Sequence, residues 1–120
     1  MKQPLRIMIV EDETLLALDM ERTLLEKGHQ VIGPFQTSAA ALSALQNNLP
    51  DLALLDVNLG RGDDSLPVAK LLRDHAIPFA FLTGYAASRT RLGDDYPLAE
   101  KIAKPCSPAL LIDTVQRLAH

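Results

Sequence analysis

Short apolar runs alternate with longer stretches of helical spacing along the whole chain. The apolar runs are too short for helices and favour buried strands at residues 5–10, 30–32, 52–55 and 79–82, and in a run that ends at 102 and 103. Amphipathic periodicity predicts helices over residues 14–27, 38–47 and 65–75, and a last helix from Ser107-Pro108 onward. Residues 86–98 are polar and include Gly93 and Pro97, so we expect a short or irregular fourth helix there.

Residue types that commonly begin or end helices flank these stretches. Gly28 follows the first helix, where a left-handed residue often stands, and Thr37 or Ser38 can cap the second. Pro67 is tolerated in the first turn of the third helix, and Gly33-Pro34 ends the weak second strand. Strands alternating with helices predict one α/β domain over residues 1–120. We expect a doubly wound, five-stranded parallel sheet of order 2-1-3-4-5, which is the flavodoxin-like arrangement.

Composition narrows the class of protein. The 120 residues are 48% hydrophobic, which supplies a full core for one domain without metals or disulfides. The net charge is −3 and no basic cluster stands out, so we expect no direct nucleic-acid binding. Neither a membrane span, which takes roughly 20 apolar residues, nor a signal-peptide pattern is present. The single cysteine, Cys106, cannot form an internal disulfide, which fits a reducing cytoplasm.

Polar residues follow several of the predicted strands at their carboxyl ends. They are Glu11 and Asp12 after the first strand, Asp56 after the third, Thr83 at the end of the fourth and Lys104 after the fifth. In the expected sheet the first and third strands are neighbours, at the switch point where open α/β sheets bind ligands. The sequence therefore predicts a crevice with three carboxylates, one hydroxyl and one ammonium.

Grouped carboxylates need a cation. Two like charges about 4 Å apart repel by roughly 4 kcal/mol at an effective dielectric near 20. Oxygen ligands without His or Cys favour Mg²⁺ or Mn²⁺, and Mg²⁺ commonly pairs one or two carboxylates with a phosphate. This pattern indicates phosphoryl transfer, with Asp56 as the nucleophile because it stands alone at the end of the central strand. Lys104 and Thr83 would then stabilise the oxygens of the transferred group.

These motifs, in this order, resemble the receiver domain of two-component response regulators over nearly the whole chain. The acidic pair of that family matches Glu11-Asp12, its phosphoacceptor matches Asp56, its Thr/Ser matches Thr83 and its Lys-Pro matches Lys104-Pro105. The resemblance implies that Asp12 binds Mg²⁺ directly and that Glu11 acts through water. It further implies that Asn58 offers its backbone carbonyl to the metal, and that the Lys104-Pro105 bond is cis.

The fourth strand and its surroundings point to a subclass and to two departures. The run Phe81-Leu82-Thr83-Gly84-Tyr85 resembles stand-alone receivers with a reduced fourth helix. Ile102 stands where most receivers carry a Tyr or Phe that rotates on activation, and Cys106 stands where Phe is common. We therefore expect output through rearrangement of residues 84–98 in place of an aromatic flip.

The leading hypothesis is a phosphorelay module. It accepts a phosphoryl group on Asp56 from a sensor histidine kinase or a histidine phosphotransfer protein, then switches binding of a downstream protein partner. The hypothesis is compatible with a homodimer and with no membrane insertion. The chain ends about where the receiver fold ends, so we expect no attached output domain. That leaves a phosphate relay or sink, a partner-binding switch, or a fragment of a larger regulator. The protein would be no enzyme beyond its own phosphorylation and dephosphorylation.

Other interpretations remain at this stage. A phosphatase with an aspartate nucleophile needs a second acid two residues later, where this chain has Asn58. A flavodoxin-like electron carrier needs a phosphate-binding loop after the first strand, and that loop is acidic here. A degenerate receiver that is never phosphorylated conflicts with the intact residue set. Glu11 and Asp12 could also cap the following helix. Cys106 is expected to be a small buried hydrophobe. The three histidines, His29, His75 and His120, are expected to be surface residues.

Overall fold

One central sheet with helices on both faces makes up the described part of the chain. A computed structural model describes residues 4–84 and 99–119. Its five parallel strands lie in the order β2-β1-β3-β6-β7. They are β1 (Arg6–Val10), β2 (Gln30–Phe35), β3 (Leu52–Asp56), β6 (Phe79–Thr83) and β7 (Glu100–Ala103). Counted along the chain, this order is 2-1-3-4-5, so the predicted topology is confirmed.

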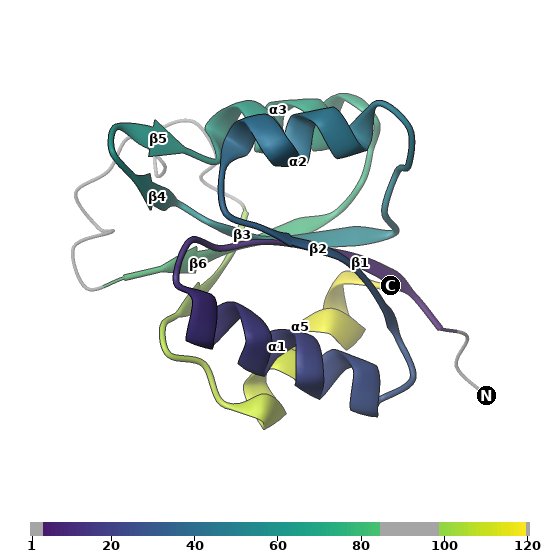
Figure 1. Cartoon of the computed structure of the whole chain (residues 1–120). Helices are drawn as coiled ribbons and strands as arrows, with labels where there is room; N and C mark the ends of the chain where they lie inside the picture. Colours follow the sequence, from purple (N-terminus) through teal and green to yellow (C-terminus); the bar gives the residue numbers. More distant parts are fainter. Residues whose placement is uncertain (1–3, 85–98, 120) are drawn as a thin grey trace.

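Two pairs of helices cover the two faces of the sheet (Figure 1). Helices α1 (Thr14–Glu26) and α5 (Pro108–Leu118) lie on one face, and α2 (Ser38–Leu45) and α3 (Leu66–Asp74) lie on the other. Successive strand side chains point to opposite faces, so β1 contributes Ile7 and Ile9 to one core and Met8 and Val10 to the other. Both faces are therefore buried, which explains why the strands read as unbroken apolar runs.

The predicted helix ends are confirmed to within two residues. Gly28 has a φ of +89° directly after the C-terminal end of α1. The Thr37 hydroxyl accepts a hydrogen bond from the Ala40 N–H at the start of α2, and the Ser107 hydroxyl caps α5 at Leu110 in the same way. These caps satisfy backbone donors that the first turn of a helix leaves without a partner.

Strand β2 is longer than the sequence predicts. The expectation that Gly33-Pro34 ends it is wrong, because pairing with β1 resumes at Phe35 after an irregularity in the register. The left-handed backbone of Gly33, with a φ of +100°, lets the chain absorb the irregularity and return to the sheet. The Glu11 N–H then donates to the Phe35 carbonyl at 2.8 Å. This bond holds the end of β1 where the acidic residues begin.

The polar segment after β3 contains structure that periodicity did not reveal. Strands β4 (Asn58–Gly60) and β5 (Asp63–Asp64) form an antiparallel hairpin, whose turn carries the left-handed residues Arg61 and Gly62. Strands this short give no detectable alternation in a sequence. The fourth helix expected at residues 86–98 lies outside the described residues. None of the described helices has the length and hydrophobicity that crossing a membrane would require.

The register irregularity in β2 makes Gly33 irreplaceable in a way that Gly28 is not. Both have positive φ, so alanine at either position costs roughly 1–2 kcal/mol of backbone strain. A Cβ at Gly33 would also lie 2.8 Å from the Phe35 nitrogen and 3.0 Å from the Ile9 carbonyl oxygen, whereas a Cβ at Gly28 meets nothing within 4 Å. We expect Gly33→Ala to lower the free energy of unfolding by at least ~2 kcal/mol more than Gly28→Ala in urea titrations. Equal losses would contradict the close approach.

Candidate functional site

The carboxyl ends of β1 and β3 bring three acidic side chains together. Val10 and Leu55 are partners in the parallel register, so Glu11 and Asp56, the next residues of the two segments, are neighbours. Glu11, Asp12 and Asp56 each offer a carboxylate oxygen, and these oxygens all lie within 4.8 Å of one another. The convergence expected from the sequence is therefore present, and we call these three residues the acidic cluster.

Lys104 reaches the acidic cluster from the end of β7. Its Nζ donates to Asp56 Oδ2 at 3.1 Å, to Glu11 Oε1 at 3.2 Å and to Glu13 Oε1 at 3.0 Å. Burial opposes the charged form, but the bonds to Glu13 and Asp56 and the charge of Glu11 outweigh it and raise the pKa of Lys104. The contact with Glu13 was not predicted. The only sequence signal for it is a third acid directly after Glu11-Asp12.

Asp56 is nearly fully buried beside a second buried acid. Asp56 is 2% exposed and Glu11 is 0% exposed. Burial, with the proximity of Glu11 and then Asp12, raises the pKa of Asp56 to about 8, although Lys104 acts in the opposite direction. The remaining bond to this carboxylate comes from the Asn58 N–H, 3.3 Å from Oδ1. In the absence of a further cation, the site favours a protonated Asp56 at neutral pH.

The acidic cluster fits a hard divalent cation. Its donors are all carboxylate oxygens, and one ammonium is too little positive charge for the nearby acids. Within residues 4–84 and 99–119 no other group of three His, Cys, Asp or Glu side chains lies close enough to hold a metal. Asn58 stands next to the cluster, and its own side chain is occupied, because Oδ1 accepts from the Gly60 N–H at 2.9 Å.

Thr83 lies at the same edge of the sheet but is not bonded to the acidic cluster. It follows Leu82, the partner of Asp56 in the register, and its hydroxyl donates to the Ile102 carbonyl at 3.3 Å. The Ile102 side chain is 2% exposed and belongs to the core under α1 and α5. The cis bond expected at Lys104-Pro105 is present. Cys106 packs against that core but is only half-buried, so the expected burial is met in part, and burial raises the pKa of its thiol.

The two described histidines, His29 and His75, are not part of the acidic cluster. His29 is half-buried, and its Nδ1 accepts a hydrogen bond from the Leu5 N–H at 3.2 Å, so its interpretation as a plain surface residue is wrong. Burial also lowers the pKa of His29. His75 is exposed after α3, as expected. His120 and Tyr85 lie outside the described residues.

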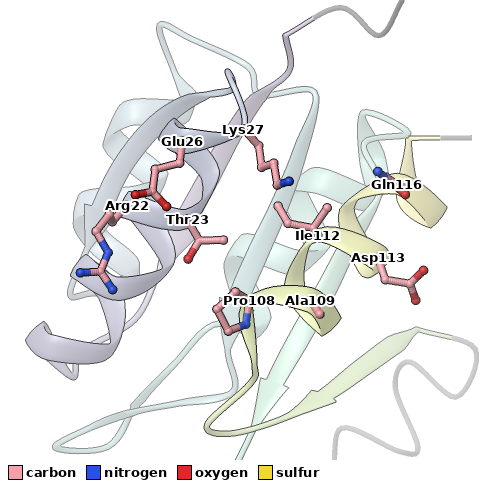
Figure 2. Close-up of a pocket in the computed structure, with 9 residues that line it drawn as sticks. All are labelled: Arg22, Thr23, Glu26, Lys27, Pro108, Ala109, Ile112, Asp113 and Gln116. Atoms are coloured by element: carbon pink, nitrogen blue, oxygen red, sulfur yellow. The ribbon is translucent and has the colours of Figure 1, made fainter.

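Two of the hollows in the described structure border helix α1, and one of these is lined by Lys104, which bonds to the acidic cluster. This hollow, of about 490 Å³, is lined by Glu13, Leu15, Leu16, Asp19, Gly84, Lys104 and Pro105. It leads from solvent to the lysine that holds Asp56. The second, of about 550 Å³, lies between α1 and α5 (Figure 2). Its lining includes the charged residues Arg22, Glu26, Lys27 and Asp113 and, unlike that of the first hollow, does not include Lys104.

The raised pKa of Asp56 makes the stability of the metal-free protein depend on pH. The folded state holds this proton up to about pH 8, while the unfolded chain releases it near 3.8. The stabilisation is complete below 3.8 and is lost as the pH rises to about 8. Asp56→Asn cannot ionise. We therefore expect it to exceed the wild type in free energy of unfolding by ~1 kcal/mol or more at pH 9, because one pKa unit is about 1.4 kcal/mol.

Urea titrations with a chelator between pH 5 and 9 measure this difference. The advantage of Asp56→Asn should shrink steadily toward pH 5. The matched control is Asp74→Asn, which changes an exposed acid at the C-terminal end of α3. A constant offset between Asp56→Asn and the wild type across this range would show that Asp56 ionises normally.

The fold and this geometry agree with comparisons to known proteins. Residues 7–116 match the family described as the response regulator receiver domain. The phyllosphere-induced regulator PhyR of Methylorubrum extorquens is 38% identical over 105 residues, which cover 86% of this chain. The chain spans only 39% of the length of that relative.

Solved structures of similar length show the same fold. The solution structure of SdrG from Sphingomonas melonis Fr1 is 32% identical, with a TM-score of 0.85 and full coverage of both chains. A response regulator receiver protein from Sinorhizobium medicae is 28% identical, with a TM-score of 0.84 over 98% of this chain and 95% of that one. The chain therefore belongs to the response regulator receiver domain family and is a phosphorelay receiver of two-component signalling.

Proposed function

We propose that Asp56 is the phosphoacceptor and that the donor is a phosphohistidine of a sensor histidine kinase or a histidine phosphotransfer protein. The observation that carries the proposal is the position of the Asp56 carboxylate. It is almost fully buried, lies within 4.8 Å of the other acids of the cluster, and is held at Oδ2 by Lys104. Burying a carboxylate beside other acids lowers the stability of the fold, and such groups are typical of functional sites. The burial of Asp56 therefore supports a catalytic role.

The proposed ligands for Mg²⁺ or Mn²⁺ are Asp12, Asp56 and the backbone carbonyl of Asn58, with Glu11 acting through water. When bound, the ion supplies the positive charge that keeps Asp56 ionised and offsets the charge of the incoming phosphoryl oxygens. The donor set supports this assignment, because every side chain in it offers a carboxylate oxygen.

The transfer we propose forms one bond and breaks one. An oxygen of the ionised Asp56 attacks the phosphorus, and the bond from phosphorus to the donor imidazole breaks. The electron pair of that bond returns to the imidazole nitrogen, and no proton has to leave Asp56 once it is ionised. Lys104, already 3.1 Å from Oδ2, then lies within reach of a phosphoryl oxygen.

The switch we propose runs through Thr83 and Lys104. The Thr83 hydroxyl would exchange its long bond to the Ile102 carbonyl for one to a phosphoryl oxygen. The Lys104 N–H donates to the Thr83 carbonyl at 2.9 Å, so movement of either residue affects the other and changes the surface at the ends of β6 and β7. A downstream protein partner would read that surface. A buried Ile102 offers no aromatic ring to rotate, which supports a change carried by the backbone.

We also infer that the chain turns over no external substrate. A phosphatase built on Asp56 would need a general acid two residues later. That residue is Asn58, whose side-chain oxygen accepts the Gly60 N–H. The acyl phosphate would be lost by hydrolysis or passed to another protein.

Phosphorylation of the purified protein tests the assignment of Asp56. We expect a small phosphodonor with Mg²⁺ to label the wild type with a hydroxylamine-sensitive phosphoryl group, and Asp56→Asn to reduce labelling by at least ~100-fold. Mass spectrometry locates the group. Phosphorylated histidine kinases presented one at a time then identify the donor.

The control for this experiment is Asp74→Asn, an exposed acid outside the acidic cluster, which should be labelled like the wild type. Labelling of Asp56→Asn at the wild-type rate would contradict the proposal, and so would labelling of the wild type that a chelator of divalent cations does not reduce.

Lys104→Ala separates phosphorylation from the response to it. Removing the ammonium leaves Asp56 and the proposed metal ligands in place, so we expect labelling to fall by about tenfold or less. The conformational response, measured as phosphorylation-dependent chemical-shift changes at Thr83 and Gly84, should be lost almost completely. Equal responses of the variant and the wild type, compared at equal phosphorylation, would exclude Lys104 from the switch.

A further inference from the structure

The β4–β5 hairpin is fastened to the start of helix α2. Asp63, on β5, accepts two hydrogen bonds from Ser38, one from the backbone N–H at 2.9 Å and one from the hydroxyl at 2.6 Å. Ser38 is the first residue of α2, where the N–H has no partner within the helix and the helix dipole favours an anion. Both oxygens of Asp63 are therefore used by one residue that lies far away in the sequence.

The Asp63–Ser38 contact is stronger than a neutral surface contact. The hydroxyl and then the N–H of Ser38 lower the pKa of Asp63, so this acid stays ionised throughout the neutral range. Hydrogen bonds to an ionised acceptor are roughly twice as strong as bonds between neutral groups. Ser38 and Asp63 are both half-buried, which limits competition from water.

The same hairpin touches the acidic cluster on its other side. Gly60, the partner of Asp63 in the hairpin register, lies against Asp12, and a Cβ on it would be 3.4 Å from Asp12 Oδ2. The Asn58 N–H donates to Asp56 Oδ1. The hairpin projects past the end of β3 on the side of the sheet that carries α2 and α3 (Figure 1). It thus bridges the acidic cluster and α2.

So short a hairpin needs an anchor. It pairs a strand of three residues with one of two, and an isolated two-stranded hairpin is marginally stable at best. Its turn also holds Arg61 in the left-handed region, with a φ of 53°. Residues other than glycine rarely adopt this backbone conformation, so the hairpin needs its ends to be fixed. The Asp63–Ser38 bonds supply that fixed end.

We propose that Asp63 and Ser38 are positioning residues that hold the β4–β5 hairpin against Asp12 and Asp56, so that the backbone carbonyl of Asn58 is preset for the divalent cation. The inference rests on the function proposed for Asp56. Supporting contacts around metal ligands are commonly worth 10- to 100-fold in metal affinity. Loss of the Asp63–Ser38 bonds weakens Mg²⁺ binding without changing any ligand.

Mg²⁺ titration calorimetry on the full chain tests this role. We expect Ser38→Ala and Asp63→Asn to raise the dissociation constant for Mg²⁺ about tenfold. Labelling by a small phosphodonor should fall in the same proportion at low Mg²⁺ and approach the wild-type rate at saturating Mg²⁺. The conservative variant Ser38→Thr keeps both donors and should retain wild-type affinity.

The matched control is Thr37→Ala, one residue earlier. It removes the capping bond to Ala40 and weakens α2 without touching the hairpin. We expect a lower melting temperature with Mg²⁺ affinity within about twofold of the wild type. Wild-type affinity in Ser38→Ala and Asp63→Asn would overturn the proposal, and so would an equal loss in Thr37→Ala.

A separate measurement distinguishes failure of this inference from failure of the proposed function. If the wild type takes up no Mg²⁺, the function proposed for Asp56 is wrong. Hydrogen exchange of the metal-free protein then tests whether the Asp63–Ser38 bonds hold the hairpin. The amides of residues 58–64 should exchange faster in Ser38→Ala than in the wild type or in Thr37→Ala. Unchanged exchange would show that Ser38 does not hold the hairpin.

Discussion

The burial of two acidic side chains next to each other, Glu11 and Asp56, is the constraint on which the rest of the site depends. Two carboxylates with 0% and 2% exposure stand side by side at the ends of adjacent strands, and a single lysine bonds to both. Ionising both acids is unfavourable by itself, because burial penalises each charge and like charges repel. The arrangement persists because a large apolar core on both sides of the sheet fixes the two strand ends in place.

The sheet sets the geometry of the site through its register. Val10 pairs with Leu55 and Asp56 pairs with Leu82, so the ends of three neighbouring strands lie within two residues of one another in the register. The side chains that follow them have no freedom to separate, since every residue just before them is buried. Lys104 completes the set from β7, the edge strand, and its backbone bond to Thr83 keeps it near these strand ends. The acids are thus placed by hydrophobic packing and not by their own interactions.

Sequence patterns predicted the parts of this protein that depend on local composition. Apolar runs predicted the strands. Glu11, Asp12, Asp56 and Lys104 were predicted as site residues because they directly follow these runs, and the end of a strand can be recognised from neighbouring residues alone. The Glu13–Lys104 and Ser38–Asp63 contacts join residues far apart in the sequence, and no periodicity reports such pairs. The extension of β2 was missed for a related reason. Gly33-Pro34 reads as a stop, and only pairing with β1 shows that the strand resumes at Phe35.

The site is attached to the scaffold on two sides that differ in strength. On the α2 side, Asp63 is held by two short bonds to Ser38 and remains ionised. On the β7 side, the Thr83 hydroxyl makes one long bond of 3.3 Å to the Ile102 carbonyl, which we propose a phosphoryl oxygen replaces. In the switch we propose, a phosphoryl group on Asp56 would lie between these two attachments and would move the weaker one. The same fold can therefore keep its proposed metal ligands fixed while the ends of β6 and β7 respond.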